Sequence, residues 1–277
     1  MMNQLIVERI SKSFKKKKAL SDVSCQFDVG LTALLGPNGA GKSTLMNIVC
    51  TLLEPDTGTV YYRGQEVKKT KAEFLGDLSV QFQNQPMYRN DTAMEYLRFC
   101  GALKELPPSQ IEAEGRELLE RFGLADTGKK KIAAFSGGMR QRLALCSAFL
   151  GAPKVILLDE PTAGLDIYER EALKRYLCEL KKDRIIVVST HIVSDVENIA
   201  DKVILLNEGQ IRVDGTQIEL IGELEGRVWE LPSDTDVGGS YFSDGKQLMI
   251  TDTAPCQAAV LKQPDLTDVY FSQVKGR

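Results

Sequence analysis

The sequence contains no long apolar run and no segment that would direct it across a membrane. No stretch approaches the ~18 consecutive apolar residues that a membrane-spanning helix needs. The charged-then-apolar pattern of a secretory signal peptide is also missing from the first residues. We therefore expect a chain that neither spans a membrane nor is secreted on its own, so that any role at a membrane requires a partner.

Neither the net charge nor the spacing of the cysteines indicates a specialised class of protein. The net charge is −3 over 277 residues, so no overall basic field attracts nucleic acid, and no nucleic-acid partner is expected. The run Lys15–Lys18 is locally basic, but such a run is most often a solvated loop. The six cysteines have no CxxC or ligand-like spacing, which is typical of reduced thiols and not of disulfides or a metal site.

Strand-like and helix-like segments alternate along most of the chain. The segment LTALL (31–35) is a continuous apolar run that ends at Gly36, as a buried strand does. Alternation of this kind is typical of a mainly parallel sheet covered by helices. We predict strands at 4–10, 23–29, 31–35, 59–62, 154–160 and 184–190, helices after Thr44 and over 168–182, and a hairpin over 201–215.

Two regions depart from this alternation. From about 92 to 150 one helical pattern follows another, so we expect an inserted helical subdomain at about 84–150. Beyond about 220, the pieces GRVWELP, GKQLMITD and DVYFSQV look like short strands separated by polar breakers. We therefore predict one domain over 1–218, with an antiparallel β subdomain beside its parallel sheet, and a small C-terminal extension over 219–277.

Residues 36–44, GPNGAGKST, match the phosphate-binding pattern G-x-x-x-x-G-K-[ST] between an apolar strand and a helix. Glycines allow backbone N–H groups to curl around phosphate oxygens, and the following helix directs its N-terminal dipole at the same charge. We expect Lys42 to reach the β- and γ-phosphates and the Ser43 hydroxyl to bind Mg²⁺. The expected nucleotide contacts are Gly36, Asn38, Gly39, Ala40, Gly41, Lys42, Ser43 and Thr44. The fold class predicted is therefore α/β with a P-loop NTPase core.

A phosphate loop requires an acidic partner for the metal, and VILLDEP (155–161) supplies one. Its apolar residues predict a buried strand that ends in Asp159 and Glu160. Asp159 is expected to hold Mg²⁺, directly or through water. Adjacent strand residues point to opposite sides, so we expect Glu160 to act differently, as the general base that polarises an attacking water.

The only histidine, His191, follows the apolar strand 184–190. Ligands of open α/β sheets bind beyond the carboxyl ends of the parallel strands. We therefore expect His191 to contact the γ-phosphate, although a lone histidine is more often structural and this alternative stays open.

A second glycine-rich helix start occurs about a hundred residues after the first, in AAFSGGMRQRLALC (133–146). Ser136, Gly137 and Gly138 precede a helical pattern, which is the format of an anion-binding helix N-terminus. The residues predict two anion-binding helix starts but do not say whether both act on the same nucleotide.

Together these motifs resemble those of the ATP-binding subunits of ATP-binding cassette (ABC) transporters, and the likeness covers roughly residues 4–217. SGGMRQR resembles the signature motif of that family, AGLD (163–166) its D-loop, and His191 its switch histidine. The resemblance implies that Ser136, Gly137, Gly138 and Asp166 contact the nucleotide.

Three glutamines, Gln81, Gln83 and Gln85, lie where the family has its Q-loop glutamine. In similar sequences an aromatic residue and then a threonine follow that glutamine at fixed offsets, and Tyr88 and Thr92 select Gln83. The resemblance implies that this side chain senses the metal and the attacking water.

Phe14 matches the aromatic residue that stacks on adenine in the family, and a core position is the alternative. The chain also departs from the family pattern. Phe135 and Met139 replace a leucine and a glutamine at the edges of the signature, and Ile167 replaces a common proline after the D-loop. The phosphate-contacting part of the signature is intact, so the resemblance still implies activity.

The resemblance further implies that the two helix starts share ATP and Mg²⁺ across a dimer. ATP bound at residues 36–44 of one chain would be covered by residues 136–138 of a second copy or of a homologous ATP-binding subunit. Two chains would close on two ATPs and reopen after hydrolysis, which is the mechanical output.

Three functions are compatible with such an ATP-binding chain. It could be the motor of a membrane transporter, a soluble ATPase acting on ribosomes or DNA, or a module that does not hydrolyse ATP. Relatives that act on ribosomes usually carry two cassettes, and those that act on DNA insert a long coiled coil, so this chain, which has neither feature, favours transport. The presence of both Glu160 and His191 argues against an inactive module. The implied partner is a separate transmembrane permease, which places the chain at the cytoplasmic face of the cell membrane. The motifs, with the ending PDLTDVYFSQV, resemble bacterial exporters of peptides, antibiotics or other small molecules, and import is the alternative.

The segment NQPMYRNDT (84–92) follows Gln83 and is expected to move as the nucleotide changes. Met87 and Tyr88 are apolar residues in an otherwise polar loop. The family resemblance implies that they line a groove for a short helix of the permease, and packing into the helical subdomain is the alternative.

Overall fold

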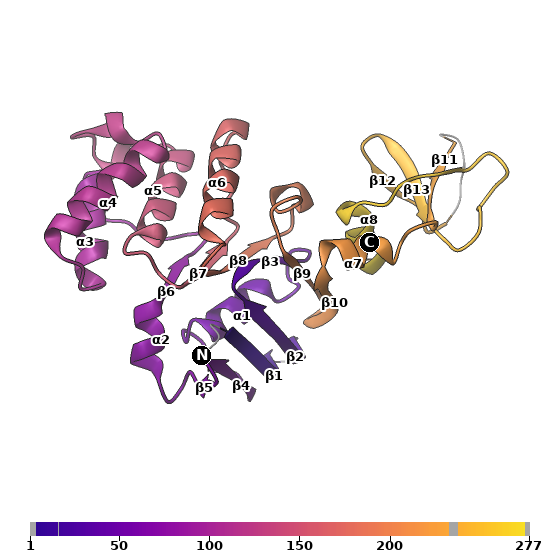
Figure 1. Ribbon diagram of the computed structural model, residues 1–277, viewed down its shortest axis with the longest axis horizontal. Coiled ribbons are helices and arrows are strands. Elements are labelled where there is room, and N and C mark those ends of the chain that lie inside the picture. Colours follow the sequence, from indigo (N-terminus) through magenta and orange to yellow (C-terminus); the bar gives the residue numbers. More distant parts are fainter. Residues whose placement is uncertain (1–3, 16, 233–237, 275–277) are drawn as a thin grey trace.

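The computed structural model describes residues 4–15, 17–232 and 238–274 (Figure 1). A six-stranded sheet at its centre has the order β10-β9-β3-β8-β7-β6, and all neighbours are parallel except β10 and β9. Its strands are β3 (Gly30–Leu35), β6 (Leu78–Gln81), β7 (Val155–Asp159), β8 (Ile185–Thr190), β9 (Lys202–Asn207) and β10 (Gln210–Thr216). The predicted α/β fold with a mainly parallel sheet is confirmed.

The carboxyl ends of the three central strands lie level with one another. β3, β7 and β8 are buried along their whole length, as their apolar runs predicted. The register pairs Leu35 with Thr190 and Asp159 with Ser189. The segments that follow these strands hold the predicted phosphate loop, general base and histidine. They therefore leave the sheet at one edge.

A second, antiparallel sheet has the order β2-β1-β4-β5. Its strands are β1 (Gln4–Phe14), β2 (Lys17–Asp28), β4 (Thr57–Tyr62) and β5 (Gln65–Glu66). Helix α1 (Lys42–Val49) contributes Leu45 and Val49 to an apolar cluster that also holds residues of β1 and β7. The helix that follows the phosphate loop therefore packs against both sheets, which holds the loop in place.

The run Lys15–Lys18 is only partly the loop that was predicted. Lys15 lies in the turn after β1, whereas Lys17 and Lys18 are the exposed first residues of β2. The strand starts earlier than its apolar residues indicated because it pairs with β1 back to Phe14.

The helical region forms a lobe at one end of the molecule (Figure 1, magenta). It contains α3 (Ala93–Leu103), α4 (Pro108–Arg121) and α5 (Gly137–Phe149), with short 3-10 helices at Ala125–Thr127 and Ile132–Ala134. Apolar side chains of the lobe, such as Leu97 and Leu118, belong to the same buried cluster as Ile156 and Leu158 of β7. The lobe is thus packed onto the central sheet.

Lys104, at the end of α3, ties this lobe to the sheet. Its Nζ donates to the carbonyl oxygens of Ser147 and Leu150 at the end of α5, at 3.0 and 2.8 Å, and to Ser79 Oγ of β6 at 3.0 Å. Burial lowers the pKa of Lys104 to about 8. The lysine satisfies helix-end carbonyls that would otherwise lack donors.

The sequence did not predict helix α2 (Lys71–Asp77) or strand β6. β6 is short, half of it is polar, and it lies at the edge of the sheet, so it lacks the apolar run that marked the central strands. Helices α6 (Ile167–Leu180) and α7 (Gln217–Gly222) complete the core region. Each begins at a capping box, which fixes its first residue.

The C-terminal extension forms a small antiparallel sheet in the order β12-β13-β11-β14. Its elements are β11 (Val228–Leu231), β12 (Tyr241–Ser243), β13 (Lys246–Ile250), β14 (Val260–Leu261) and helix α8 (Leu266–Gln273). The prediction of strands at GRVWELP and GKQLMITD is confirmed.

The prediction of a strand at DVYFSQV was wrong, because these residues lie in and just after α8. Asp265 caps the helix: its Oδ1 accepts from the Asp268 backbone N–H at 3.0 Å, while its own N–H donates to Asp268 Oδ2 at 2.8 Å. The fully buried Asp268 also accepts from Lys262 Nζ and from the Tyr241 hydroxyl, each at 2.7 Å. α8 packs against α7 and β9 (Figure 1), so the extension is docked on the core.

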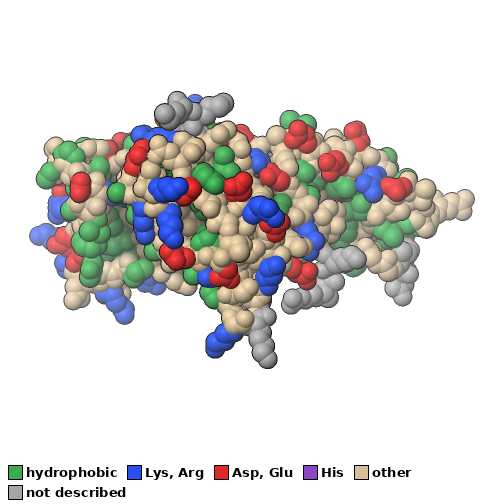
Figure 2. Space-filling view, turned by 90° about the horizontal axis from the view of Figure 1, so that it is seen from below, with side chains coloured by type: hydrophobic (Ala, Val, Ile, Leu, Met, Phe, Trp, Pro, Cys, Tyr) green, Lys and Arg blue, Asp and Glu red, His purple; other side chains and the backbone are tan. Residues whose placement is uncertain are grey.

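Among the residues that the structure describes, no helix has the length and apolar content to span a membrane. On the face shown in Figure 2, Lys and Arg side chains are interspersed with Asp and Glu, so charge of one sign does not dominate that face.

Candidate functional site

The phosphate loop uses conformations that require glycine. Gly41 precedes α1 with φ 112°, and a Cβ there would lie 2.7 Å from the Ala19 carbonyl oxygen. A Cβ on Gly36 would lie 2.1 Å from the Leu206 carbonyl oxygen, which no side chain can tolerate. A Cβ on Gly39 would meet nothing within 4 Å. The loop is therefore shaped by the strands behind it and is open on the side of Gly39.

Lys42 is 6% exposed and its ammonium is held by its own loop. Nζ donates to the Gly36 carbonyl oxygen at 2.7 Å and to that of Pro37 at 3.3 Å, and it lies 3.9 Å from Glu160 Oε1. Burial lowers the pKa of Lys42, and the nearby Glu160 and Asp159 oppose that shift. The ammonium can exchange its bonds to neutral carbonyls for stronger ones to phosphate oxygens.

Ser43 and Asp159 meet directly, as the metal prediction requires. Ser43 Oγ donates to Asp159 Oδ2 at 3.0 Å, and Asp159 is 7% exposed. Its other oxygen, Oδ1, is buried and has no hydrogen-bond partner among the described residues. Mg²⁺ takes one or two protein oxygens and completes its shell with water and substrate phosphates. The Ser43 hydroxyl and the unpartnered Asp159 oxygen supply ligands of this kind, so the donor set fits Mg²⁺.

Glu160 and His191 form a pair beside Lys42. Glu160 Oε1 lies 2.8 Å from His191 Nδ1, and Oε2 accepts from Thr190 Oγ1 at 3.3 Å. The backbone of Glu160 has φ 49°, a left-handed conformation that is strained for a residue with a side chain. The His191 side chain is 43% exposed. His191 therefore lies at the open edge of the site and is not enclosed in the core.

Sequence reasoning missed the residues that hold the two loops that follow Glu160 and His191. Gln141 of α5 donates to the Pro161 carbonyl oxygen at 2.8 Å. Asp195, 4% exposed in the 3-10 helix after β8, accepts from Thr162 Oγ1 and from Arg170 Nη1, the latter at 3.2 Å. Asp195 thus links the loop after Glu160 to the loop after His191. Its partners are distant in sequence, so no local pattern indicated them.

The second helix start is also built as predicted, but it stands apart from the first. Ser136 caps α5 by accepting from the Met139 N–H at 3.2 Å, and Ser136 and Gly137 are exposed. A Cβ on Gly138 would lie 2.8 Å from the Gly164 carbonyl oxygen, so the signature segment touches the D-loop of its own chain. In the described part of the chain, no hydrogen bond or ion pair joins residues 136–138 to residues 36–44.

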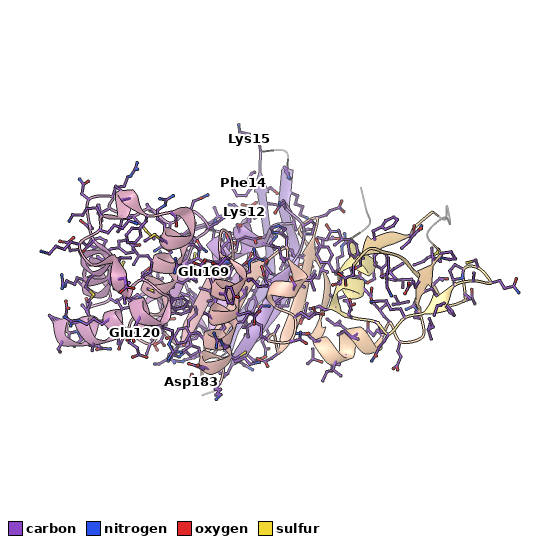
Figure 3. The ribbon with its side chains drawn as sticks, turned by 90° about the horizontal axis from the view of Figure 1, so that it is seen from above. Lys12, Phe14, Lys15, Glu120, Glu169 and Asp183 are labelled. Atoms are coloured by element: carbon purple, nitrogen blue, oxygen red, sulfur yellow. The ribbon has the colours of Figure 1, made fainter. Side chains whose placement is uncertain are left out.

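Asp166 has a structural role in addition to the predicted nucleotide contact. Its Oδ1 accepts from the Glu169 N–H at 2.9 Å and its own N–H donates to Glu169 Oε2 at 3.0 Å, which caps α6. Glu169 (labelled in Figure 3) also pairs with Arg142 of α5, with Oε1 and Nε 3.0 Å apart. These contacts fix the D-loop against the signature helix. The nucleotide contact of Asp166 stays a prediction.

Phe14 is 49% exposed at the end of β1, where Figure 3 shows it near the tip of the hairpin. Lys12 Nζ lies 5.9 Å from the centroid of its ring. An exposed ring is not a core residue, so the alternative interpretation of Phe14 is wrong. Stacking on adenine stays a prediction.

The three candidate glutamines have different surroundings. Gln81 is fully buried, and Gln85 Nε2 donates to the Tyr96 hydroxyl at 2.9 Å and to Ser147 Oγ at 3.2 Å. Gln83 is exposed and lines a pocket that it shares with Gln141 and Gly164. Gln85 lines the same pocket but is only partly exposed, so Gln83 is the most exposed of the three, and its role at the nucleotide stays a prediction.

Comparisons with known proteins found a matching family model and similar chains. The protein-family model that matches residues 20–163 is described as "ABC transporter". The uncharacterized ABC transporter ATP-binding protein YxlF of Bacillus subtilis (strain 168) is 34% identical over 263 residues, which are 95% of this chain and 87% of that protein. The sulfate/thiosulfate import ATP-binding protein CysA of Gloeobacter violaceus is 32% identical over 78% of this chain and 63% of that protein.

Solved structures show the same fold. A structure described as the ATP-binding subunit of an ABC transporter aligns with a TM-score of 0.74 and 29% identity over 80% of this chain and 93% of that one. The dimeric ATP-binding cassette MJ0796, solved with ADP and Pi, aligns with a TM-score of 0.71 and 24% identity over 76% of this chain and 98% of that one.

Proposed function

The chain belongs to the ABC transporter family as an ATP-binding ATPase subunit, and from this premise we propose how its two anion-binding segments divide the work. The observation that carries the proposal is their contrast. The loop at 36–44 meets the metal-binding, basic and acidic groups of its own chain, whereas residues 136–138 are largely exposed and bond to no residue of that loop.

The proposed mechanism follows from the contacts of the loop edge. Lys42 transfers its hydrogen bonds from loop carbonyls to the β- and γ-phosphates of ATP. Ser43 and Asp159 would hold Mg²⁺, which would offset the charge of the phosphates. Glu160 accepts a proton from the attacking water, and His191, whose Nδ1 faces Glu160, keeps its other ring nitrogen available for the γ-phosphate.

The remaining predicted residues act around this centre. To Gln83, which is exposed and lines a pocket with Gly164, we assign the sensing of the metal and the water. Phe14 stacks on the adenine. Ser136, Gly137 and Gly138 cover the nucleotide held by a second copy of the chain or by a homologous subunit, and Asp166 joins that contact from the adjoining D-loop.

A single experiment tests the two-chain site. The Glu160→Gln chain is purified and its mass in solution is measured by analytical ultracentrifugation with ATP and Mg²⁺, and again with ADP. We expect a dimer with ATP and a monomer with ADP, because the amide cannot accept the proton and the closed state persists. A chain that stays monomeric in both nucleotides contradicts the shared site.

The permease contact is proposed at the segment after Gln83. Tyr88 is 59% exposed, and its ring meets Phe99 edge-on with centroids 5.1 Å apart. Met87 lines a small pocket with Arg89 and Arg140. This adaptable apolar area suits a short cytoplasmic helix of a permease.

Substituting Met87 and Tyr88 with Asp tests that contact. We expect transport and assembly with the permease to fail while the isolated subunit still folds and binds ATP. A melting temperature well below that of the parent, or normal transport, contradicts the assignment. Leu103→Asp is the matched control, since Leu103 is 70% exposed on the same lobe at the end of α3.

We propose export as the direction, with the chain at the cytoplasmic face of the cell membrane through its permease. The support for export is the likeness of the motifs and of the ending PDLTDVYFSQV to bacterial exporter cassettes, since the name of YxlF states no direction and CysA is an import subunit. Import remains the second candidate because of that relative. Transport in inside-out vesicles containing the copurified permease separates the two, since an exporter accumulates its substrate inside them on addition of ATP.

A further inference from the structure

Two apolar residues just beyond the D-loop take no part in the site and are open to solvent. Ile167 and Tyr168, the first residues of α6, are 72% and 84% exposed. The capping contact of Asp166 with Glu169 fixes the first turn that carries them. Single exposed apolar residues are common. An adjacent pair on a rigid turn beside a functional loop is more informative when a complementary surface exists.

Such a surface lies beside the phosphate loop. A groove of about 690 Å³ separates residues 37–40 from the end of α8. Its apolar lining comes from Pro37 on one side and from Tyr270, Phe271 and Val274 on the other. The Asn207 side chain donates to the Gln273 carbonyl oxygen at 3.3 Å, which holds the end of α8 at this place. The C-terminal extension therefore forms one wall of a groove whose other wall is the nucleotide loop.

We propose that Ile167 and Tyr168 of one copy pack into the groove between the phosphate loop and α8 of the other copy when two chains close on ATP. The inference rests on the proposed two-chain function and assigns to the C-terminal extension a part in the dimer interface. By two-fold symmetry the contact occurs twice.

Continuity with the shared nucleotide site is the reason for choosing a second copy as the occupant. Gly138 touches Gly164 within one chain, so wherever residues 136–138 cover a partner's phosphate loop, the D-loop arrives with them. Ile167 follows Gly164 by three residues, a span of at most about 11 Å. The groove begins at Pro37–Ala40, which belong to the loop that the signature segment covers in the proposed two-chain site. The exposed pair and the groove are therefore brought together by the same closure.

The chemistry of the two surfaces also matches. The groove offers two half-buried aromatic rings and Val274, which suit a branched aliphatic and an aromatic side chain. The ion pair of Glu208 and Arg212, with Oε2 and Nη2 3.6 Å apart, lines the same groove and can remain at its polar rim.

The test uses the full chain with Glu160→Gln, whose ATP-dependent dimerisation is measured by ultracentrifugation. Ile167→Ala with Tyr168→Ala removes the apolar pair without adding charge, and Phe271→Ala removes its proposed partner. Each should weaken dimerisation at least about tenfold, as for a buried interface anchor, and leave ATP binding by the monomer within about twofold. Ile218→Ala is the matched control, because Ile218 is 86% exposed on α7, and its dimerisation should equal that of the parent.

A double-mutant comparison separates direct contact from independent damage. If the two sites touch, the combined variant should weaken dimerisation less than the product of the separate effects. In a second measurement, a Tyr168→Cys chain mixed with a Phe271→Cys chain should form a disulfide between copies on oxidation with ATP but not with ADP. A Phe242→Cys chain, 68% exposed elsewhere in the extension, should not replace Phe271→Cys.

Each outcome decides one claim. If the Glu160→Gln parent stays monomeric with ATP, the two-chain function fails, and this inference falls with it. If the parent dimerises but the alanine variants match it, or their effects multiply independently and no cross-link forms, the two-chain function stands and the groove contact is overturned.

Discussion

The two predicted anion-binding helix starts of this chain share a glycine-rich sequence pattern, but the first is surrounded by buried polar groups and the second is exposed to solvent. At the first, Lys42 and Asp159 are nearly buried, and each has charged or hydroxyl groups of its own chain within reach. At the second, Ser136 and Gly137 are exposed, and the hydrogen bonds at this turn serve the helix itself. The first is enclosed by groups of its own chain, and the second is exposed, as the proposed two-chain site requires.

A phosphate-binding turn alone therefore does not make a site for ATP hydrolysis. Both turns offer backbone N–H groups and a helix dipole. Only the first adds Asp159, the proposed general base Glu160 and a histidine, because β3, β7 and β8 end at one level. Four substitutions, in order of decreasing expected effect, test this contrast between a complete and an incomplete site.

Glu160→Gln removes the proposed base from the complete site. We expect turnover to fall roughly 100- to 10,000-fold while ATP affinity stays near that of the parent, because the amide keeps the shape but cannot take the proton. Single-turnover and steady-state hydrolysis assays measure the loss. Retained multiple turnover in this variant would exclude Glu160 as the base.

Lys42→Ala removes the buried ammonium of the same site. ATP binding should weaken at least roughly 100-fold, since charge-assisted hydrogen bonds to the triphosphate are lost. Calorimetric titration of the monomer with ATP gives the affinity. Lys18→Ala, an exposed lysine at the start of β2, is the matched control and should bind normally. An affinity near that of the parent for Lys42→Ala contradicts the loop assignment.

Ser136→Arg alters the incomplete site instead. Binding of the first ATP should change less than about twofold, whereas ATPase activity should fall at least about tenfold because the added bulk and charge block closure. Mixing this variant with Lys42→Ala chains should restore activity above the sum of the two alone, since one composite site is then intact. No recovery on mixing, or full activity of either variant alone, argues against the shared arrangement.

Asp195→Asn tests the link between the loops that follow Glu160 and His191. Arg170 and Thr162 lose the carboxylate that positions them, and we expect kcat to fall about tenfold, in line with one charged hydrogen bond, with the ATP dissociation constant unchanged. Asp201→Asn is the control. Asp201 pairs with Lys181 and accepts the Leu31 N–H at the opposite edge of the sheet, so its loss should lower stability without changing kcat. If Asp195→Asn and Asp201→Asn lowered kcat equally, Asp195 would have only a structural role.

Much of the fold and of the complete site could be predicted from local patterns. The apolar runs of β3, β7 and β8 predicted buried strands, and His191 was expected beyond the carboxyl end of its strand, where the structure has it. The sequence did not predict β6, which has no apolar run, nor α8, where Val269 and Phe271 alternate with polar residues as in a strand. The buried Asp268 and its capping contact with Asp265 decided in favour of a helix.

Residue type and short spacing were enough to set the chemistry of this protein: the glycines of the phosphate loop, Lys42 and Ser43, the carboxylates after β7, and the second glycine-rich helix start. Such signals act over a few residues of backbone, so they can be read from the chain alone. Which groups meet depends on the folded molecule. The fold placed Glu160 Oε1 2.8 Å from His191 Nδ1, joined Asp195 to Arg170, and brought the end of α8 beside the phosphate loop. These contacts join segments that are distant in sequence, because strand register and apolar packing, which no short motif records, bring them together.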